Sequence, residues 1–248
     1  KLAYGSYRPN EDNGPGKQKG QYRVVSEEID DDRLIDLWNN HLEGKESLGI
    51  VPICEDNTCV WGAIDIDTYP LDLAELIERL VKRGEMPFVV ARSKSGGAHV
   101  YCFVSEPVSA ALMQSKLKEI AASFGYGTAE IFPKQTKLLL EKGDRGNILN
   151  MPYFGGASST RYAHNDEVFL THANNKKISK RELENLAPPS IVNADDNPDL
   201  VGAPPCLKVL CSMGFPEGTR NNGLFDLGVF LRKKHQDDWE RKVEEFNF

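Results

Sequence analysis

The sequence predicts an α+β fold built around a β-α-β-β-α-β unit. A strand-like apolar run at residues 59–66 is followed by a run with helical spacing. Two further strand-like runs then flank a Gly-rich loop, and a second helical run and a short strand close the unit. This order is that of the split βαβ, or ferredoxin-like, arrangement.

The helices of this unit have clear starts and ends. The first begins after Asp72, a residue suited to an N-cap, and Gly84 stops it. The second begins at Ser109 and ends at Gly125. Strands are expected at residues 59–66, 88–91, 99–104 and 128–132.

An N-terminal α/β extension, over about residues 1–58, is expected before this unit. The chain to about Gly20 is rich in Gly, Pro, Asn and Lys, which predicts a loop. A helical run capped by Asp30 to Asp32 and closed by Gly44 follows, and then a strand at residues 48–53. With the core unit, which we expect to span residues 59–187, the extension forms one domain of residues 1–187.

The rest of the chain predicts a small second domain. Strand-like pieces at 137–140 and 147–149 complete the first domain, and residues 188–205 carry Pro and Asp breakers that predict a linker. Residues 206–248 show helical spacing. Because the chain starts at Lys1 without Met and ends in a helix-like run, we expect a trimmed piece of a longer protein.

Composition excludes several classes of protein. The chain has 248 residues, of which 40% are hydrophobic and 27% charged, and no apolar stretch approaches the ~18 residues of a membrane span. Five cysteines and no secretory leader favour a reducing, cytoplasmic compartment. The net charge of −7 argues against coating nucleic acid through bulk charge, but it allows a local basic groove.

Two carboxylates end the first strand of the core unit. Asp65 and Asp67 share one face, while Ile64 and Ile66 point to the helix-covered face, so we expect the acidic face to be open. In this topology His99 and Glu130 lie on the two neighbouring strands. Like charges this close repel unless a cation such as Mg²⁺ or Mn²⁺ compensates them. Alternatively, the two aspartates simply end a strand and cap a turn.

The loop before His99 is basic and rich in Gly. Gly96 and Gly97 allow the backbone to present N–H groups to an anion, and Arg92, Lys94 and Ser95 add charge and a hydroxyl. The alternative is a solvated hairpin turn. The nearby carboxylates favour the first interpretation, because a triphosphate and a divalent cation need each other.

These motifs, in this order, resemble the archaeo-eukaryotic primase superfamily, and most closely its primase-polymerase branch in phages, plasmids and bacterial mobile or defence systems. Each motif is loose, but four in order are specific. The matching stretches are Trp61-Gly-Ala-Ile-Asp-Ile-Asp67, Ser95-Gly-Gly-Ala-His99, Glu130-Ile-Phe-Pro-Lys-Gln135 and Asn150-Met-Pro-Tyr153.

The resemblance implies a DNA primase and DNA polymerase whose core is a palm similar to RNA-recognition domains. Asp65, Asp67 and Glu130 would hold two metal ions, one to activate a 3′-hydroxyl and one to stabilise the leaving pyrophosphate. The incoming nucleoside triphosphate would be bound by His99, Gly97, Gly96, Ser95, Lys94 and Arg92. Many relatives carry Ser two residues before the motif His, where this chain has Gly97.

The resemblance also implies partners and a setting. These are a single-stranded DNA template and primer, a replicative helicase domain or protein, and the cytoplasm of a bacterial or phage-infected cell, with no membrane. Residues 206–248 resemble the helical accessory domain of these proteins. The residues expected to follow the template backbone are Lys134, Lys137, Lys142 and Arg145.

Other interpretations remain open. A non-catalytic nucleotide- or single-strand-binding module could use the same sheet, with Tyr101 and Phe103 stacking on bases, although core packing suits them equally. A metal-dependent nuclease or replication initiator is a further alternative, but an initiator would want a His-x-His pair, which the sequence lacks. Weaker features are two possible zinc half-sites, Cys54 with Cys59 and Cys206 with Cys211, and two histidines beside an expected strand, His164 and His172.

Overall fold

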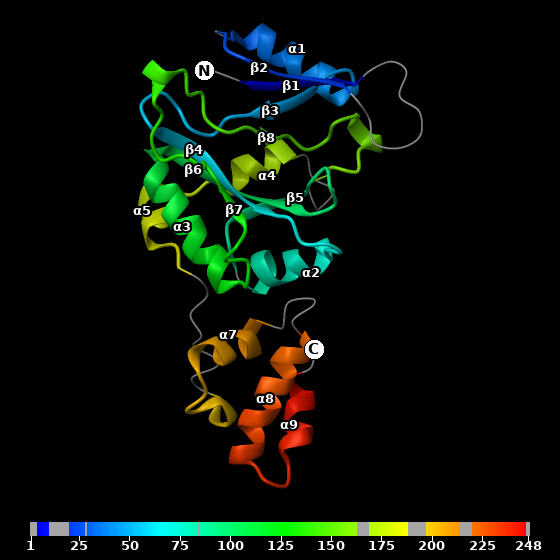
Figure 1. Ribbon diagram of the computed structural model, residues 1–248, viewed down its shortest axis with the longest axis vertical. Coiled ribbons are helices and arrows are strands. Elements are labelled where there is room, and N and C mark those ends of the chain that lie inside the picture. The colour runs from blue at the N-terminus through cyan, green and yellow to red at the C-terminus, as the bar shows by residue number, and fades with distance from the viewer. Residues whose placement is uncertain are drawn as a thin grey trace.

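The computed structural model describes residues 4–9, 20–27, 29–83, 85–162, 169–187, 197–213 and 220–246. It is a mixed α/β structure with two four-stranded antiparallel sheets, as an α+β fold requires. Figure 1 shows the first sheet and α1 on one side of the central sheet, with α2 and α3 on the other side.

The central sheet has the strand order β5-β6-β4-β7, and all of its pairs are antiparallel. β4 therefore lies between β6 and β7, the neighbours expected for the first strand of a β-α-β-β-α-β unit. The first crossover contains a short α-helix that continues as a π-helix, and the second contains one longer α-helix. The elements are β4 (Thr58–Ile66), α2 (Leu73–Ile77), the π-helix (Glu78–Arg83), β5 (Phe88–Arg92), β6 (Ala98–Ser109), α3 (Ala110–Ser123) and β7 (Glu130–Phe132).

Both helices of this unit begin at side-chain caps. The carboxylate of Asp72 accepts hydrogen bonds from the backbone N–H groups of Ala74 and Glu75, and the hydroxyl of Ser109 accepts one from Leu112 N–H. They cover one face of the central sheet, where their apolar side chains pack on Ile64, Ile66 and other buried residues. Gly62 permits this close packing, because a Cβ there would lie 2.6 Å from Met113 Cγ and 2.7 Å from Phe132 O.

The prediction of an N-terminal loop is wrong for residues 4–9, which belong to the first sheet. Residues 4–9 form a strand that pairs with one strand on each side, and such long-range pairing leaves no local signal in a Gly- and Pro-rich segment. The helix α1 (Asp31–Leu42) covers this sheet, and its Leu37 packs with Tyr4 and Leu48. The strands are β1 (Tyr4–Pro9), β2 (Gly20–Val25), β3 (Ser47–Ile50) and β8 (Leu149–Asn150), in the order β2-β1-β3-β8.

Several predicted boundaries also change. The strand expected at 48–53 ends at Ile50, and the one expected at 99–104 continues to Ser109. The segment 137–140 is not a strand, and a 3₁₀ turn, Leu140–Lys142, begins at its last residue. A second 3₁₀ turn lies at Gly156–Ser158.

The sequence had suggested that the second face of the central sheet is open. In the structure, part of this face is covered. Tyr101, Phe132 and Ala63 on this face are buried against Leu149 and Met151, which belong to the segment that joins the two sheets. The open face was inferred from the core unit alone, and the covering residues come from a distant part of the chain. Of the predicted acidic residues, Asp67 and Glu130 are exposed, whereas Asp65 is mostly buried.

The described helices in the C-terminal part of the chain pack around a hydrophobic cluster of their own. Leu200, Leu207 and Leu227 belong to this cluster, so the packing starts within residues 188–205, which the sequence assigned to a linker. The stretch before His172, expected to be a strand, is helical from residue 169, while His164 lies outside the described residues. The remaining elements are α4 (Phe169–Asn175), α5 (Lys180–Asn185), the 3₁₀ turn Pro198–Leu200, α7 (Pro205–Met213), α8 (Arg220–Lys234) and α9 (Trp239–Glu245). Among the described residues no helix is both long and apolar enough to cross a bilayer.

Candidate active site

Three of the predicted site residues form one row across the central sheet. Asp65 on β4 is paired directly with His99 on β6 and with Glu130 on β7. Directly opposed residues of an antiparallel pair point to the same face, so the three side chains are neighbours. Asp67 lies two residues further along, immediately after the end of β4.

Asp65 and His99 lie close together in a mostly buried position. Asp65 Oδ1 is 3.4 Å from His99 Nε2, and their side chains are 15% and 9% exposed. The two atoms lie within ion-pair distance but do not form a hydrogen bond, and among the described residues Asp65 Oδ1 is a buried acceptor without a hydrogen-bond partner. A buried carboxylate oxygen without a donor is costly, which is typical of a position that holds a cation when the protein works.

The other ring nitrogen of His99 is held by Tyr101. His99 Nδ1 lies 3.2 Å from the Tyr101 hydroxyl, which also lies 3.4 Å from the backbone carbonyl oxygen of Asn150. Burial raises the pKa of Tyr101 far above its ordinary value, so its hydroxyl stays protonated. Tyr101 was considered for base stacking, but it is buried and orients the imidazole of His99.

Asp67 has an exposed partner that sequence reasoning did not identify. The Tyr69 hydroxyl lies 2.7 Å from Asp67 Oδ1 and 2.6 Å from Ser95 Oγ. A phenol has one proton, so it donates to one of these oxygens and accepts from the other; donation to the carboxylate is favoured by its charge. Tyr69 therefore connects the acidic strand end to the glycine-rich loop.

Glu130 forms an ion pair with Lys134, which lies just after the end of the same strand. Lys134 Nζ lies 2.5 Å from Glu130 Oε2 and 4.9 Å from the centroid of the Phe132 ring. The Glu130 side chain is 59% exposed. Lys134 was predicted to contact DNA, whereas here its charge compensates that of a predicted metal ligand.

The glycine-rich loop is closed by its own backbone. Ser93 N–H donates to Gly97 O at 2.9 Å, and Gly96 N–H donates to Ser93 O at 3.2 Å, so the Gly96 amide already has a partner. A Cβ at Gly97 would overlap the carbonyl oxygen of Ile66. The loop is thus pressed against the end of β4, and the serine that many relatives carry at this position would not fit this backbone.

The N-terminal sheet adds residues that the sequence did not indicate. Lys94 Nζ lies 4.8 Å from the centroid of the Tyr7 ring, so the glycine-rich loop touches β1. Arg161 is buried, donates from Nη1 to Ser47 Oγ at 3.2 Å and lies over the Phe154 ring. Burial lowers the pKa of Arg161 from its ordinary value. No motif marked Tyr7 or Arg161, because only the tertiary packing brings them to these partners.

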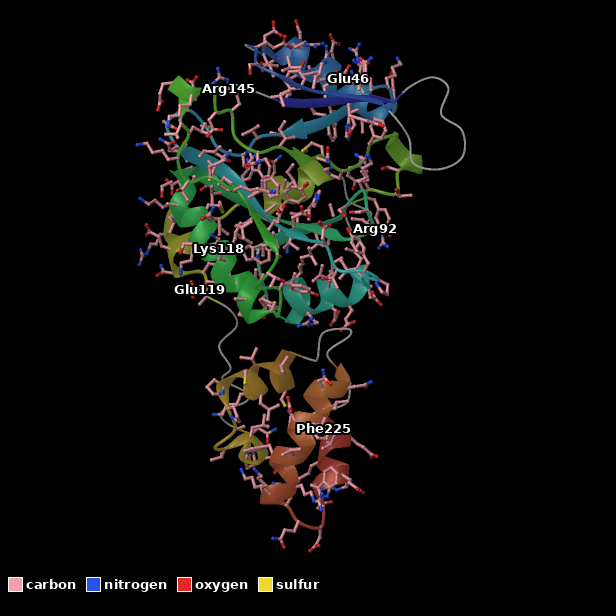
Figure 2. All side chains as sticks on the ribbon, viewed as in Figure 1. Glu46, Arg92, Lys118, Glu119, Arg145 and Phe225 are labelled. Atoms are coloured by element: carbon pink, nitrogen blue, oxygen red, sulfur yellow. The ribbon has the colours of Figure 1, made fainter. Side chains whose placement is uncertain are left out.

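The predicted template-binding residues differ in exposure and in their contacts. Lys137 and Lys142 are exposed, and Arg145 Nη1 donates to the backbone oxygen of its neighbour Asp144 at 3.0 Å. Figure 2 shows Arg145 and Arg92 on opposite sides of this part of the molecule.

The donor set suits a hard divalent cation. Asp65, Asp67 and Glu130 offer carboxylate oxygens, which Mg²⁺ and Mn²⁺ prefer, and among the described residues Asp65 Oδ1 has no hydrogen-bond partner. In the described part of the chain, no group of three or more His, Cys, Asp or Glu side chains is arranged so that it could hold a metal ion. Asp67 and Glu130 are instead engaged by Tyr69 and Lys134. The cysteines proposed as zinc half-sites are free thiols.

A comparison with known families agrees with this arrangement. The family described as the TOTE conflict system, Archaeo-Eukaryotic Primase domain, matches residues 6–187, which include the acidic row and the glycine-rich loop. The chain therefore belongs to this family, and with it to the archaeo-eukaryotic primases, a superfamily of primase-like nucleotidyltransferases. The resemblance found in the sequence is confirmed. A search of curated proteins finds no match.

Proposed function

We propose that this protein is a template-directed nucleotidyltransferase, a primase-polymerase that synthesises or extends primers on single-stranded DNA. The observation that carries the proposal is the row of Asp65, His99 and Glu130 across three strands, inside the matched primase domain. On this proposal the central sheet is the catalytic palm.

The carboxylates of Asp65, Asp67 and Glu130 would hold Mg²⁺ or Mn²⁺. When bound, such ions activate a hydroxyl nucleophile and stabilise charge on the leaving phosphate. Asp65 would bind through Oδ1, which accepts no hydrogen bond from any described residue, while Tyr69 restrains Asp67 by a hydrogen bond.

The triphosphate would be bound between His99 and the glycine-rich loop. Tyr101 fixes the plane of the His99 ring and leaves Nε2 on the Asp65 side. Lys94 and Arg92 would supply positive charge, and Ser95, Gly96 and Gly97 would line the loop. Because the Gly96 amide is used inside the loop, side chains are the more important donors here.

The DNA would be contacted by the segment that follows β7. Lys134, Lys137, Lys142 and Arg145 come from this segment and would supply local positive charge in a chain of net charge −7. We also propose the C-terminal helices as an accessory domain, a helicase as a partner, and the reducing cytoplasm of a bacterial or phage-infected cell as the setting.

The test is a primer-synthesis assay on an unprimed single-stranded template, with deoxy- or ribonucleotides and with Mg²⁺ or Mn²⁺. The double variant D65N/D67N should lose roughly a hundredfold or more of the rate, because each tenfold loss needs only ~1.4 kcal/mol of transition-state stabilisation. The control is E119Q, which removes a carboxylate from α3 on the other side of the sheet and should keep the wild-type rate (Figure 2). Incorporation of nucleotide by D65N/D67N at the wild-type rate would refute the assignment of Asp65 and Asp67 to the catalytic site.

A non-catalytic single-strand-binding module is the second candidate, and one observation favours it. Trp61 and Phe103 are paired on the same face as the acidic row and are only partly buried, so they could stack on bases. If the wild type incorporates no nucleotide and its binding to single strands depends on Trp61, these results would support this candidate over the first.

A further inference from the structure

The ion pair between Glu130 and Lys134 joins two residues with different expected partners. Glu130 is a proposed metal ligand, and Lys134 is a proposed contact to DNA phosphates. In the structure Lys134 takes the place of the cation at Glu130, and Glu130 takes the place of the phosphate at Lys134. The ammonium and the carboxylate, 2.5 Å apart, compensate each other's charge. The two ligands would compete with this ion pair, because a cation at Glu130 and a phosphate at Lys134 each supply the charge that the partner side chain now supplies.

The pair is built so that only side chains need to move. Gln114 Nε2 donates to the backbone oxygens of Pro133 at 3.0 Å and Lys134 at 2.7 Å, which fixes this backbone to α3. Both side chains reach solvent, with 59% of Glu130 and 33% of Lys134 exposed, and exposed ion pairs are weak. A divalent cation at Glu130 would repel the ammonium of Lys134 as well as take its carboxylate.

We propose that Lys134 is exchanged between Glu130 and a nucleic-acid phosphate, so that binding of a divalent cation makes this lysine available to single-stranded DNA. This inference rests on the proposed function, because it takes Glu130 as a ligand of the cation. The exchange couples the two ligands: the cation strengthens DNA binding, and DNA strengthens cation binding by the same factor.

Lys137 provides a matched control. It is exposed, lies three residues further along the same segment, and forms no side-chain ion pair or hydrogen bond with any residue that the structure describes. Its contribution to DNA binding should therefore be independent of the cation, apart from ordinary screening.

The experiment measures the affinity of the full chain for a labelled single-stranded oligonucleotide by fluorescence anisotropy, with and without Mn²⁺, at several salt concentrations. In the wild type, Mn²⁺ should raise affinity about fivefold, a small coupling for two linked sites. K134M should abolish this gain. Only when Mn²⁺ is present, it should also lower the slope of log affinity against log salt concentration by about 0.7, the value for one phosphate contact on a single strand. K137M should lose affinity equally in both conditions, and K134R should keep the coupling.

Manganese binding without DNA is the second measurement, by calorimetry. K134M should bind Mn²⁺ several times more tightly than the wild type, because the cation no longer competes with the ammonium, and K137M should bind as the wild type does. Equal losses of DNA affinity with and without Mn²⁺ in K134M would overturn the exchange while leaving the metal site intact. If the wild type binds no Mn²⁺ and D65N/D67N changes nothing, the proposed function fails, and the exchange fails with it.

Discussion

Asp65 Oδ1 and His99 Nε2 lie 3.4 Å apart across the β4–β6 pair, within ion-pair distance but without hydrogen-bond geometry. The direct pairing of their strands places the two side chains next to each other. On the proposed function, Asp65 Oδ1 would bind the cation and His99 Nε2 would bind the triphosphate beside it.

Replacing His99 with Gln should separate these two functions. We expect the affinity for a nucleoside triphosphate to fall about tenfold to a hundredfold, since hydrogen bonds to charged groups contribute ~1.5–3 kcal/mol. Binding of Mn²⁺ alone should stay within about twofold. Calorimetry with each ligand measures both values, and an equal loss of the two would place His99 among the metal ligands.

Replacing Tyr69 with Phe should weaken the link between Asp67 and the glycine-rich loop. The variant loses the hydroxyl that lies 2.7 Å from Asp67 and 2.6 Å from Ser95, but keeps the ring. We expect KM for the nucleotide to rise roughly threefold to tenfold, with a smaller change in kcat. Y162F, at another exposed tyrosine, is the control and should leave both constants unchanged.

Replacing Gly97 with Ala should displace the loop. The new Cβ would overlap Ile66 O, which is backbone and cannot rotate away, so we expect a destabilisation of about 1–3 kcal/mol and loss of triphosphate binding. The control G127A places its Cβ in ordinary contact, 3.6 Å from Ala122, and should change stability little. Thermal unfolding measures the stability of both variants. If G97A binds triphosphate as the wild type does, the loop does not need this close approach to Ile66.

His41 should make stability depend on pH. Leu48 N–H donates to its Nδ1 and its Nε2–H meets Pro152 O, so the ring is neutral, and burial lowers its pKa from 6.5 to about 4. The unfolded chain therefore binds an extra proton between these values, and stability falls as the pH drops from about 6.5 to about 4, by up to roughly 3 kcal/mol.

H41Q removes this titration while an amide can make both hydrogen bonds. Urea unfolding at pH 7 and pH 5 should show a smaller difference for H41Q than for the wild type. An equal difference in the two proteins would assign the pH dependence to other groups.

Asp199 should stabilise the C-terminal helices above its unfolded pKa. The hydrogen bond from Lys242, at 2.6 Å, holds the pKa of Asp199 below its ordinary value, so this stabilisation is lost as the pH falls to about 4 and below. D199N should speed hydrogen exchange in α8 and α9 at pH 7 and leave the central sheet unchanged. D238N, at an exposed ion pair with Arg241, should have a much smaller effect.

Much of the core unit could be predicted from the sequence because its signals are local. Asp72 and Ser109 cap the two helices as expected, and apolar residues alternate with the site residues in β4. The row of Asp65, His99 and Glu130 followed from this alternation and the order of the strands. The strand at Tyr4–Pro9 did not, because its partners come from β2 and β3, and its own composition indicates a loop.

The partners of the site residues could not be predicted for the same reason. Nothing in the order of residues indicates that Tyr69 reaches both Asp67 and Ser95, or that Arg161 meets Ser47, more than one hundred residues away. Both contacts depend on how loops and sheets pack.

The sequence by itself predicted which residues carry the proposed chemistry: carboxylates and a histidine that period-two strands place on one face, with a glycine-rich loop beside them. Only the tertiary structure decided how each charge is compensated. Among the described residues Asp65 Oδ1 has no hydrogen-bond partner and lies 3.4 Å from His99 Nε2, whereas Glu130 is paired with Lys134. Strand periodicity sets the direction of a side chain, but its electrostatic partner depends on distances in space, which the packing of the whole domain fixes.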